Sequence, residues 1–535
     1  MGKRYVPIQM HLHASHEPAA SMEAHFARCV QVGIAHTFLT EHDTRMGPKQ
    51  NPVRIFVFSE PTLFQKDVGG LPAGFRAAEG MTAQVAFSPE NGLYELILTA
   101  EDGQEGELTF FSDKRHCDPL FDRLTVDYFG SVDVVGDAGA VVDFTLSVRP
   151  PDFTAAHLVY AAGSFPVSGT HTRCLPLKET ENGTFSFPIT ANSDEVTGGL
   201  DNAFCTVSLR VRAGIGGKAV LRLRRLEFRR ELAFEEDRRE MTRLAETIGR
   251  RYGVTPYVTF EITGAGHHKN CYSTAVPVLD YAARDFSVTQ EDAIAHVRAY
   301  GGIFCYNHPF TEWKRADADG GKQERYLDEC AENLIRNRVF GATLMEVGFP
   351  SSKENFGAEY YLRLWDRLSL AGIFITGDGD SDNHSGRESG WLYNNNFCSF
   401  AAIEGEPDEE KFRNAFCSGD LFFGDPTKLG VLSLTGNGRP MGAVLTGANA
   451  EIRFTASGIR CEGKLRRIVN GAVDAEMTLS HGGAEDAFLL SAVRDFSFVR
   501  YEILDTDGRL TGGTNPIYLV ADGVPFSAAP ERRYP

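Results

Sequence analysis

A change of hydrophobic periodicity, which occurs twice along this 535-residue chain, most constrains its fold. Residues 5–13 and 35–40 are short apolar runs typical of strands, and residues 22–30 between them repeat apolar side chains at helical spacing. Residues 53–230 instead show short alternating runs separated by Gly, Asp, Asn and Pro. Helices and strands alternate again from residue 253. Because strand–helix–strand order implies a parallel sheet, the chain is predicted to be an α/β protein interrupted by a β-sandwich.

Within the second α/β part, we expect strands at residues 257–262, 303–306, 343–347 and 373–376. Helices are expected at 235–252, 289–300, 326–338, 360–371 and 409–418, with a capping box formed by Thr289 and Asp292. The predicted domains are therefore a split α/β barrel (1–52 and 231–424), an inserted β-sandwich (53–230) and a C-terminal β-domain (425–535). The strand rhythm of the insert is similar to jelly-roll or carbohydrate-binding modules, although we favour a structural lid or an oligomer interface.

The composition excludes several classes of partner. The formal net charge is −18, and so acidic a surface repels nucleic-acid phosphates and anionic lipid. The ten Cys form no CxxC pair, and several lie in apolar runs, which favours buried thiols in a reducing compartment. No apolar stretch approaches the length of a transmembrane helix. We expect a cytoplasmic protein that acts on a small molecule, and homo-oligomerisation stays open.

Potential metal ligands lie at the ends of five predicted strands. His11 and His13 end the first strand, and residues two apart in a strand point to the same side. The other strand ends carry Glu41-His42-Asp43, Glu261, His308, and Asp382 with His384. In a barrel of alternating strands and helices, these strand ends share one face, where active sites are found. A buried structural histidine could explain any one of these motifs but not the whole set.

These motifs resemble the PHP (polymerase and histidinol phosphatase) superfamily of metal-dependent hydrolases. The resemblance covers residues 1–50 and 253–425 and rests on HLH at 11–13, TEHD at 40–43, Glu261, HHKN at 267–270, NHP at 307–309 and SDNH at 381–384. The segment FEITGAGHHKN and the later TNPIYL at 514–519 look more like the carbaryl-hydrolase-like (CehA/McbA) branch. The resemblance implies a (β/α)7-like barrel that binds two or three divalent ions of Zn, Mn or Fe.

Carried over position by position, the resemblance gives each residue a role. His11, His13 and Asp382 would hold one metal, and Glu261 would bridge to a second. His268 and His308 would complete the second metal, whereas His42 and His384 would hold a third. The chain departs from the family pattern at Gln9-Met10, where Asp is usual, and at Glu41. His16 and Glu17 compete for one further ligand position, and His267 competes with His268, which we prefer.

Residues beside these motifs could assist the chemistry. Arg45 and Arg387 each follow a metal motif and could clamp a substrate phosphate or carboxylate, although solvated surface arginines are an equal alternative. Asp378 and Asp380 could orient ligand imidazoles, or form a simple acidic turn. A hydroxide bridging two metals about 3.5–4 Å apart would make a protein nucleophile unnecessary.

We therefore predict a metal-dependent hydrolase, first a phosphoesterase acting on a small phosphoester or a sugar derivative. A hydrolase of a carboxyl ester, amide or carbamate is the second reading, because the same hydroxide serves both. A sugar- or partner-binding protein with a vestigial barrel is the third.

Overall fold

The computed structural model describes residues 3–14, 22–46, 233–281, 284, 287–310, 320–349, 352–353, 356–384 and 396–526, and the backbone of the strands between 55 and 229. The chain divides into two compact units. The first comprises Met1–His13, His25–Thr44 and Gly249–Pro535, and the second comprises Ala14–Ala24 and Arg45–Ile248. Each unit is described by itself, and the predicted boundary at residue 425 stays a prediction.

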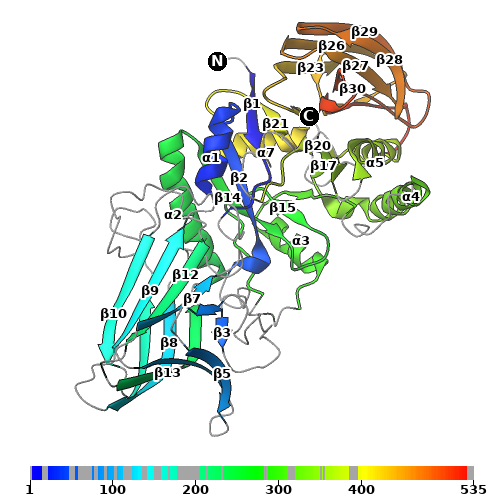
Figure 1. The fold of residues 1–535 in the computed structure, drawn as a ribbon. Helices are drawn as coiled ribbons and strands as arrows, with labels where there is room; N and C mark the ends of the chain where they lie inside the picture. Colours follow the sequence, from blue (N-terminus) through cyan, green and yellow to red (C-terminus); the bar gives the residue numbers. More distant parts are fainter. Residues whose placement is uncertain are drawn as a thin grey trace. The chain divides into compact units, whose positions relative to one another are not determined.

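The first unit contains most of the helices and a long mixed sheet (Figure 1). Its helices, with those that cross a unit boundary, are α1 (Met22–Gln31), η1 (Asp43–Arg45), α2 (Phe234–Tyr252), α3 (Gln290–Ala299), α4 (Gly320–Arg336), η8 (Arg338–Gly341), α5 (Ala358–Leu370) and α7 (Glu409–Ser418). Its strands before residue 425 are β1 (Arg4–Gln9), β2 (His36–His42), β14 (Thr255–Ile262), β15 (Lys269–Cys271), β16 (Phe304–Tyr306), β17 (Leu344–Gly348), β18 (Ser352–Lys353), β19 (Phe356–Gly357), β20 (Thr376–Gly379), β21 (Cys398–Ile403) and β22 (Leu421–Gly424).

Six strands of the long sheet point in the same direction. β1, β2 and β14 are parallel neighbours, as are β16, β17 and β20, and the short antiparallel strand β15 joins the two groups. The carboxyl ends of these six strands therefore lie on one side of the sheet. A parallel bridge between Leu12 and Asn383 connects the segments that follow β1 and β20. The fold is thus mixed α/β and rich in strand, but the strand pairing is an open path, so the predicted barrel is not established.

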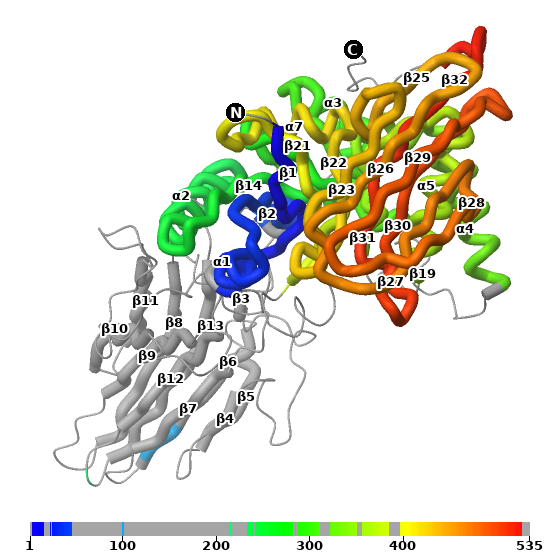
Figure 2. Tube along the Cα trace, turned by 90° about the horizontal axis from the view of Figure 1, so that it is seen from above, coloured from blue at the N-terminus to red at the C-terminus, as the bar shows by residue number. Residues whose placement is uncertain are grey.

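The sheet continues from β1 through antiparallel strands into the C-terminal part. The later strands are β23 (Val431–Gly436), β24 (Arg439–Pro440), β25 (Val444–Thr446), β26 (Asn449–Ile459), β27 (Gly463–Val469), β28 (Ala472–Leu479), β29 (Gly482–Ser491), β30 (Phe496–Asp505), β31 (Leu510–Thr514) and β32 (Ile517–Val520). These strands lie together in orange and red in Figure 2. A four-stranded sheet of β24, β23, β26 and β29 packs on the long sheet, with the rings of Phe454 and Tyr501 stacked 4.1 Å apart.

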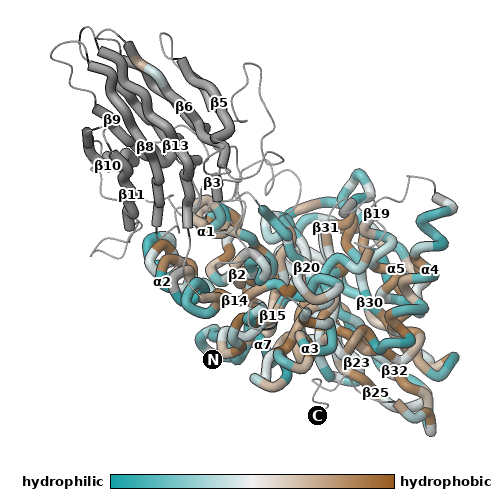
Figure 3. Tube along the Cα trace, turned by 90° about the horizontal axis from the view of Figure 1, so that it is seen from below, coloured by the Kyte–Doolittle hydropathy of each residue, from teal (hydrophilic) through white to brown (hydrophobic). Residues whose placement is uncertain are grey.

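The core of the first unit follows from apolar periodicity. Phe412, Ala415 and Phe416 occupy one face of α7 and are buried in a cluster with Ile8 and Phe38 from β1 and β2. Helices α4 and α5 pack side by side, and both alternate hydrophilic and hydrophobic segments, as amphipathic helices do (Figure 3). Within the described part of the chain, no helix combines the length and apolar character needed to cross a bilayer.

The local predictions can be compared with the observed elements. The capping box of Thr289 and Asp292 at the start of α3 is confirmed, and Cys271, Cys305 and Cys398 are buried thiols as predicted. The strand expected at residues 373–376 begins only at Thr376, and α4 begins at Gly320, six residues before its predicted start. β15 was not predicted, because three residues are too few to display an alternating pattern.

Every described element of the second unit between residues 55 and 229 is a strand, and every pairing is antiparallel. The strands are β3 (Ile55–Val57), β4 (Phe75–Ala77), β5 (Thr82–Ser88), β6 (Leu93–Glu101), β7 (Glu105–Phe111), β8 (Arg123–Val134), β9 (Val141–Arg149), β10 (Leu158–Pro166), β11 (Gly169–Pro176), β12 (Phe204–Arg212) and β13 (Gly217–Arg229). They form a five-stranded and a six-stranded sheet, and β12 of the first contacts β6 and β13 of the second. Two antiparallel sheets in contact agree with a β-sandwich.

Candidate metal centre

Strand pairing explains why the predicted ligands meet. Glu261 near the end of β14 is the register partner of His42 on β2, so their side chains leave the sheet on the same side. His11 and His13 lie just beyond β1, on the extended segment whose Leu12 pairs with Asn383. Eight of the described ligand candidates come together: His11, His13, His42, Glu261, His268, His308, Asp382 and His384.

The carboxylate of Glu261, which is fully buried, lies at the centre of this cluster. Its Oε1 atom is 3.2 Å from Nδ1 of His268, 3.4 Å from Nε2 of His308 and 3.6 Å from Nε2 of His11. The side-chain amide of Asn307 donates a hydrogen bond of 2.6 Å to the same oxygen. One oxygen of a single carboxylate therefore faces imidazoles from three separate segments.

The second oxygen of Glu261 faces a different pair of imidazoles. Its Oε2 atom lies 2.7 Å from Nδ1 of His42 and 3.8 Å from Nε2 of His13. Because the two oxygens address two sets of nitrogens, the carboxylate has the position expected of a ligand shared between two cations.

Asp382 closes the cluster from the segment after β20. Its Oδ1 atom is 3.2 Å from Nε2 of His11, 3.3 Å from Nε2 of His13 and 3.6 Å from Nδ1 of His384. Asp382 has a left-handed backbone with φ of 47°, and His308 also has a positive φ of 21°. Such conformations cost energy for residues other than Gly and gather at functional sites.

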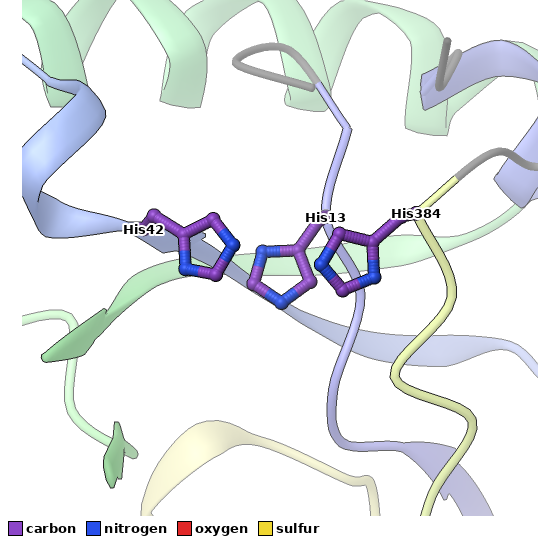
Figure 4. Close-up of side chains that lie close together, drawn as sticks. All are labelled: His13, His42 and His384. Atoms are coloured by element: carbon purple, nitrogen blue, oxygen red, sulfur yellow. The ribbon is translucent and has the colours of Figure 1, made fainter. Parts of the chain in front are cut away.

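His42, His13 and His384 form a row in which His13 is central (Figure 4). Its ring centroid is 4.3 Å from that of His42 and 4.1 Å from that of His384. One nitrogen of each ring lies within 4.8 Å of one nitrogen of each of the others. Three imidazoles from distant segments are thus arranged as a potential metal-binding group.

The donor set fits a divalent transition metal. Imidazole and carboxylate ligands suit Zn, Mn and Fe. Nδ1 of His13 is buried without a hydrogen-bond partner, an arrangement that costs energy unless a ligand compensates. The backbone carbonyl of His13 accepts a 2.9 Å hydrogen bond from Nε2 of His25, which helps to hold this segment. Among the described residues, four groups of side chains could hold a metal, and three of them contain His13 or His42.

The pKa shifts follow from burial and from the close approach of charges. Burial tends to lower the pKa of His11, but Asp382 and Glu346 raise it above the usual histidine value. Burial, with His384 and His42 nearby, lowers the pKa of His13 well below that value, which leaves this imidazole neutral.

Glu261 is shifted in the opposite sense from an ordinary buried carboxyl. Burial alone would raise its pKa, but hydrogen bonds from His268 and His308 hold the pKa well below the usual range. Glu261 is therefore an ionised carboxylate, the form that binds a cation.

His267 and His268 separate clearly in space. His267 stacks on the ring of Tyr306 with centroids 4.1 Å apart, and its Nε2 atom donates to the backbone carbonyl of Asn307 at 2.7 Å. His268 is the one placed beside Glu261, in line with the preference drawn from the HHKN spacing. His16, Glu17, Arg387 and the side chain of Arg45 lie outside the described residues.

Asp378 and Asp380, predicted to orient imidazoles or to form a turn, are both buried. Oδ2 of Asp380 is 3.9 Å from Nδ1 of His11. Asp378 instead accepts a weak hydrogen bond from the thiol of Cys305 at 3.7 Å. Burial and the neighbouring Glu346 raise the pKa of Asp378 to about 7.

Sequence reasoning missed two polar residues that support the site. Glu346 contacts Nδ1 of His11 at 2.6 Å, and its only signal was a carboxylate inside the apolar run TLMEVG. Gln9 stands where the PHP pattern has Asp, and its Oε1 atom accepts the backbone N–H groups of Met10 at 3.0 Å and Ser381 at 3.1 Å. The neutral Gln9 thus ties the segment after β1 to the segment after β20.

Comparisons with known proteins do not assign a family. No family model and no curated protein matches the chain. An exo-β-agarase is similar over 33% of this chain and 24% of its own, with 17% identity and a TM-score of 0.22. A carbohydrate-binding module of the β-sandwich superfamily matches over 30% of this chain and 58% of its own, with 12% identity and a TM-score of 0.20. The xylan-binding domain CBM22-1 of Paenibacillus barcinonensis Xyn10C matches over 34% and 96%, with 12% identity and a TM-score of 0.21. Similarities this low carry no inference about function.

Proposed function

We propose that this chain is a metal-dependent hydrolase of the PHP type, and that its first unit forms a seven-stranded barrel. The strands would be β1, β2, β14, β15, β16, β17 and β20, and the parallel bridge between Leu12 and Asn383 would close the ring. In such a barrel the ligand cluster lies where six parallel strands end, the usual place of an active site.

The position of Glu261 carries the proposal. Its two oxygens separate the imidazoles into two sets, as a carboxylate shared by two cations would. We assign His11 and His13 to one metal with Asp382, because one oxygen of Asp382 contacts both imidazoles, and we assign His268 and His308 to a second. His11 lies between the two sets, since it also faces the Glu261 oxygen that faces His268 and His308. His42 and His384 would hold a third, because they group with His13. When bound, these ions would supply Lewis acidity and lower the pKa of the attacking water.

The exposure of the ligands indicates the side from which substrate approaches. The side chains of His384 and His268 are 40% and 28% exposed, whereas those of His11, His13 and Glu261 are fully buried. The exposed imidazoles would meet the substrate, and the buried ones would exclude water from the opposite side.

The charge of the cluster favours an anionic substrate. Among the described residues, the carboxylates within 4 Å of its imidazole nitrogens are those of Glu261, Asp382, Glu346 and Asp380, and these four negative charges would neutralise only part of the charge of three divalent ions. The remaining positive potential attracts a phosphate group more strongly than a neutral ester, amide or carbamate. We therefore propose a phosphoesterase.

Glu261→Gln tests this function, because it preserves volume while removing the shared negative charge. We expect the parent protein to carry at least two transition-metal ions per chain and to hydrolyse at least one phosphomonoester or phosphodiester. The variant should bind less metal and turn over several orders of magnitude more slowly, with an unchanged circular dichroism spectrum. Asp420→Asn is the matched control, since Asp420 is also buried but bonds Tyr5 and Lys3 elsewhere in the same unit.

Other outcomes would direct the assignment elsewhere. Turnover of carboxyl esters, amides or carbamates alone would replace the phosphoesterase reading with the second hydrolase reading. Bound metal without turnover on the whole panel would favour a binding protein. Less than one metal ion per chain after reconstitution would end the proposal.

A further inference from the structure

One carboxylate contacts two of the candidate ligands from outside the cluster. Glu346 lies on β17 and is buried. Its Oε1 atom is 2.6 Å from Nδ1 of His11, and its Oε2 atom accepts the backbone N–H of His308 at 2.6 Å. Glu346 thus joins ligands that are carried by the segments following β1 and β16.

The contact with His11 determines which ring nitrogen is available to a metal. An imidazole that donates its Nδ1–H to a carboxylate retains the lone pair on Nε2. Nε2 of His11 is the atom that faces Asp382 at 3.2 Å and Glu261 at 3.6 Å. Without Glu346 the proton could move to Nε2, and His11 would then present a donor to the cluster instead of a ligand atom.

The contact between Glu346 and His308 constrains the backbone of His308, not its imidazole ring. His308 has a positive φ of 21°, which needs support from its surroundings. Glu346 supplies that support by accepting the amide N–H of His308, and Nε2 of His308 points to Glu261 at 3.4 Å.

We propose that Glu346 is a positioning residue of the metal centre, which fixes the Nδ1–H tautomer of His11 and the backbone of His308 through its two oxygens. This inference rests on the proposed function, because it requires metal at the cluster. It assigns to Glu346 no contact with substrate.

Glu346→Gln separates this role from a general effect of charge. Glutamine has the same shape but a single acceptor oxygen, so it cannot accept from both His11 and His308. Asp378→Asn is the matched control, because Asp378 is the register partner of Glu346 on β20 and accepts a hydrogen bond from the thiol of Cys305. Both variants remove a buried carboxyl from neighbouring strands.

Two measurements are needed, and neither depends on turnover. Metal affinity is measured by competition with a chelator, and the tautomer of His11 is read from the nitrogen shifts of 15N-histidine-labelled protein, assigned with a His11→Gln variant. We expect Glu346→Gln to weaken metal binding by about 10- to 100-fold. In metal-free samples at a pH where His11 is neutral, Glu346→Gln should also lose the uniform Nδ1–H form, whereas Asp378→Asn should change neither property by more than a small factor.

The outcomes distinguish this inference from the proposed function. A parent protein that binds no metal would defeat the proposed function itself. A parent that binds metal while Glu346→Gln binds it equally tightly, or with the His11 tautomer unchanged, would overturn the role of Glu346. Equal losses in the two variants would overturn it too, in favour of a charge effect. If the Gln variant does not fold, Glu346→Asp, which keeps the charge but shortens the reach, should show the same weakening.

Discussion

Two arginine–carboxylate pairs that share helix α5 have similar geometry but very different burial. Arg500 on β30 donates to both oxygens of Asp366 at 2.7 and 2.8 Å and to Glu502 at 2.6 Å, and its side chain is 3% exposed. Arg363 donates to both oxygens of Glu324 at 2.6 and 2.7 Å, but its side chain is 42% exposed. Replacing each arginine by Met therefore compares the stability contributed by a buried pair with that of an exposed pair whose hydrogen bonds have nearly the same geometry.

The expected losses of unfolding free energy differ several-fold. Arg500→Met leaves the buried carboxylates of Asp366 and Glu502 without their cation, and breaking a buried pair in this way costs about 3–5 kcal/mol. Arg363→Met should cost about 0.2–1 kcal/mol, because water solvates both partners of an exposed pair.

The Arg500 variant should also acquire a characteristic pH dependence. Burial already raises the pKa of Asp366, and removing Arg500 takes away the main opposing effect. A carboxyl group with a raised folded-state pKa binds protons more readily in the folded protein than in the unfolded chain. The protein's stability therefore falls as the pH rises from the unfolded-state pKa to the folded-state pKa of that group. The destabilisation should therefore shrink as pH is lowered from 7 towards 5.

Urea unfolding followed by Trp365 fluorescence measures these effects. Trp365 lies beside Arg500, with the guanidinium carbon 5.8 Å from the ring centroid. The chain has three Trp, so the other two, Trp313 and Trp391, are replaced by Phe in every sample. The two compact units need not unfold together, and this signal reports on the unit that contains Trp365. Equal losses in the Arg500 and Arg363 variants, or a loss below about 1 kcal/mol for Arg500→Met, would refute the reasoning.

Two further predictions concern the site and helix α7. His268→Ala should lower the metal content, measured by elemental analysis, because His268 lies beside Glu261. His267→Ala should keep the metal, because His267 stacks on Tyr306. The reverse result would make His267 the ligand. Asp408→Ala should cost about 1 kcal/mol, because the Asp408 side chain caps α7 by accepting the N–H of Lys411 at 2.8 Å. That hydrogen bond holds the pKa of Asp408 below its usual value, so the stabilisation is complete above about pH 4 and is lost as pH falls further. The unfolding free energies of parent and variant in urea should therefore converge below about pH 4. A difference that stays constant with pH would contradict the capping role.

The tertiary structure revealed long-range contacts of residues whose sequence neighbours did not indicate them. Asn515, in the TNPIYL segment, is buried and bonds the backbone of Gly377 in both directions and the carbonyl of Leu421. It thereby joins β20 and β22, yet its sequence neighbours indicate only a turn before a strand. A buried side-chain amide of this kind supplies hydrogen-bond partners to buried backbone N–H and C=O groups. Those backbone groups come from distant parts of the chain, so neighbouring residues do not reveal the role.

Short-range periodicity, by contrast, was sufficient to select candidate metal ligands at or just beyond strand ends. The two-residue repeat of a strand predicts that His11 and His13 share a side, and the end of an apolar run identifies Glu261 as a strand-terminal carboxylate. Both inferences need only neighbouring residues. The tertiary structure alone decided that Glu346, 335 positions from His11, supports that imidazole, because the register between separate strands depends on packing of the whole unit.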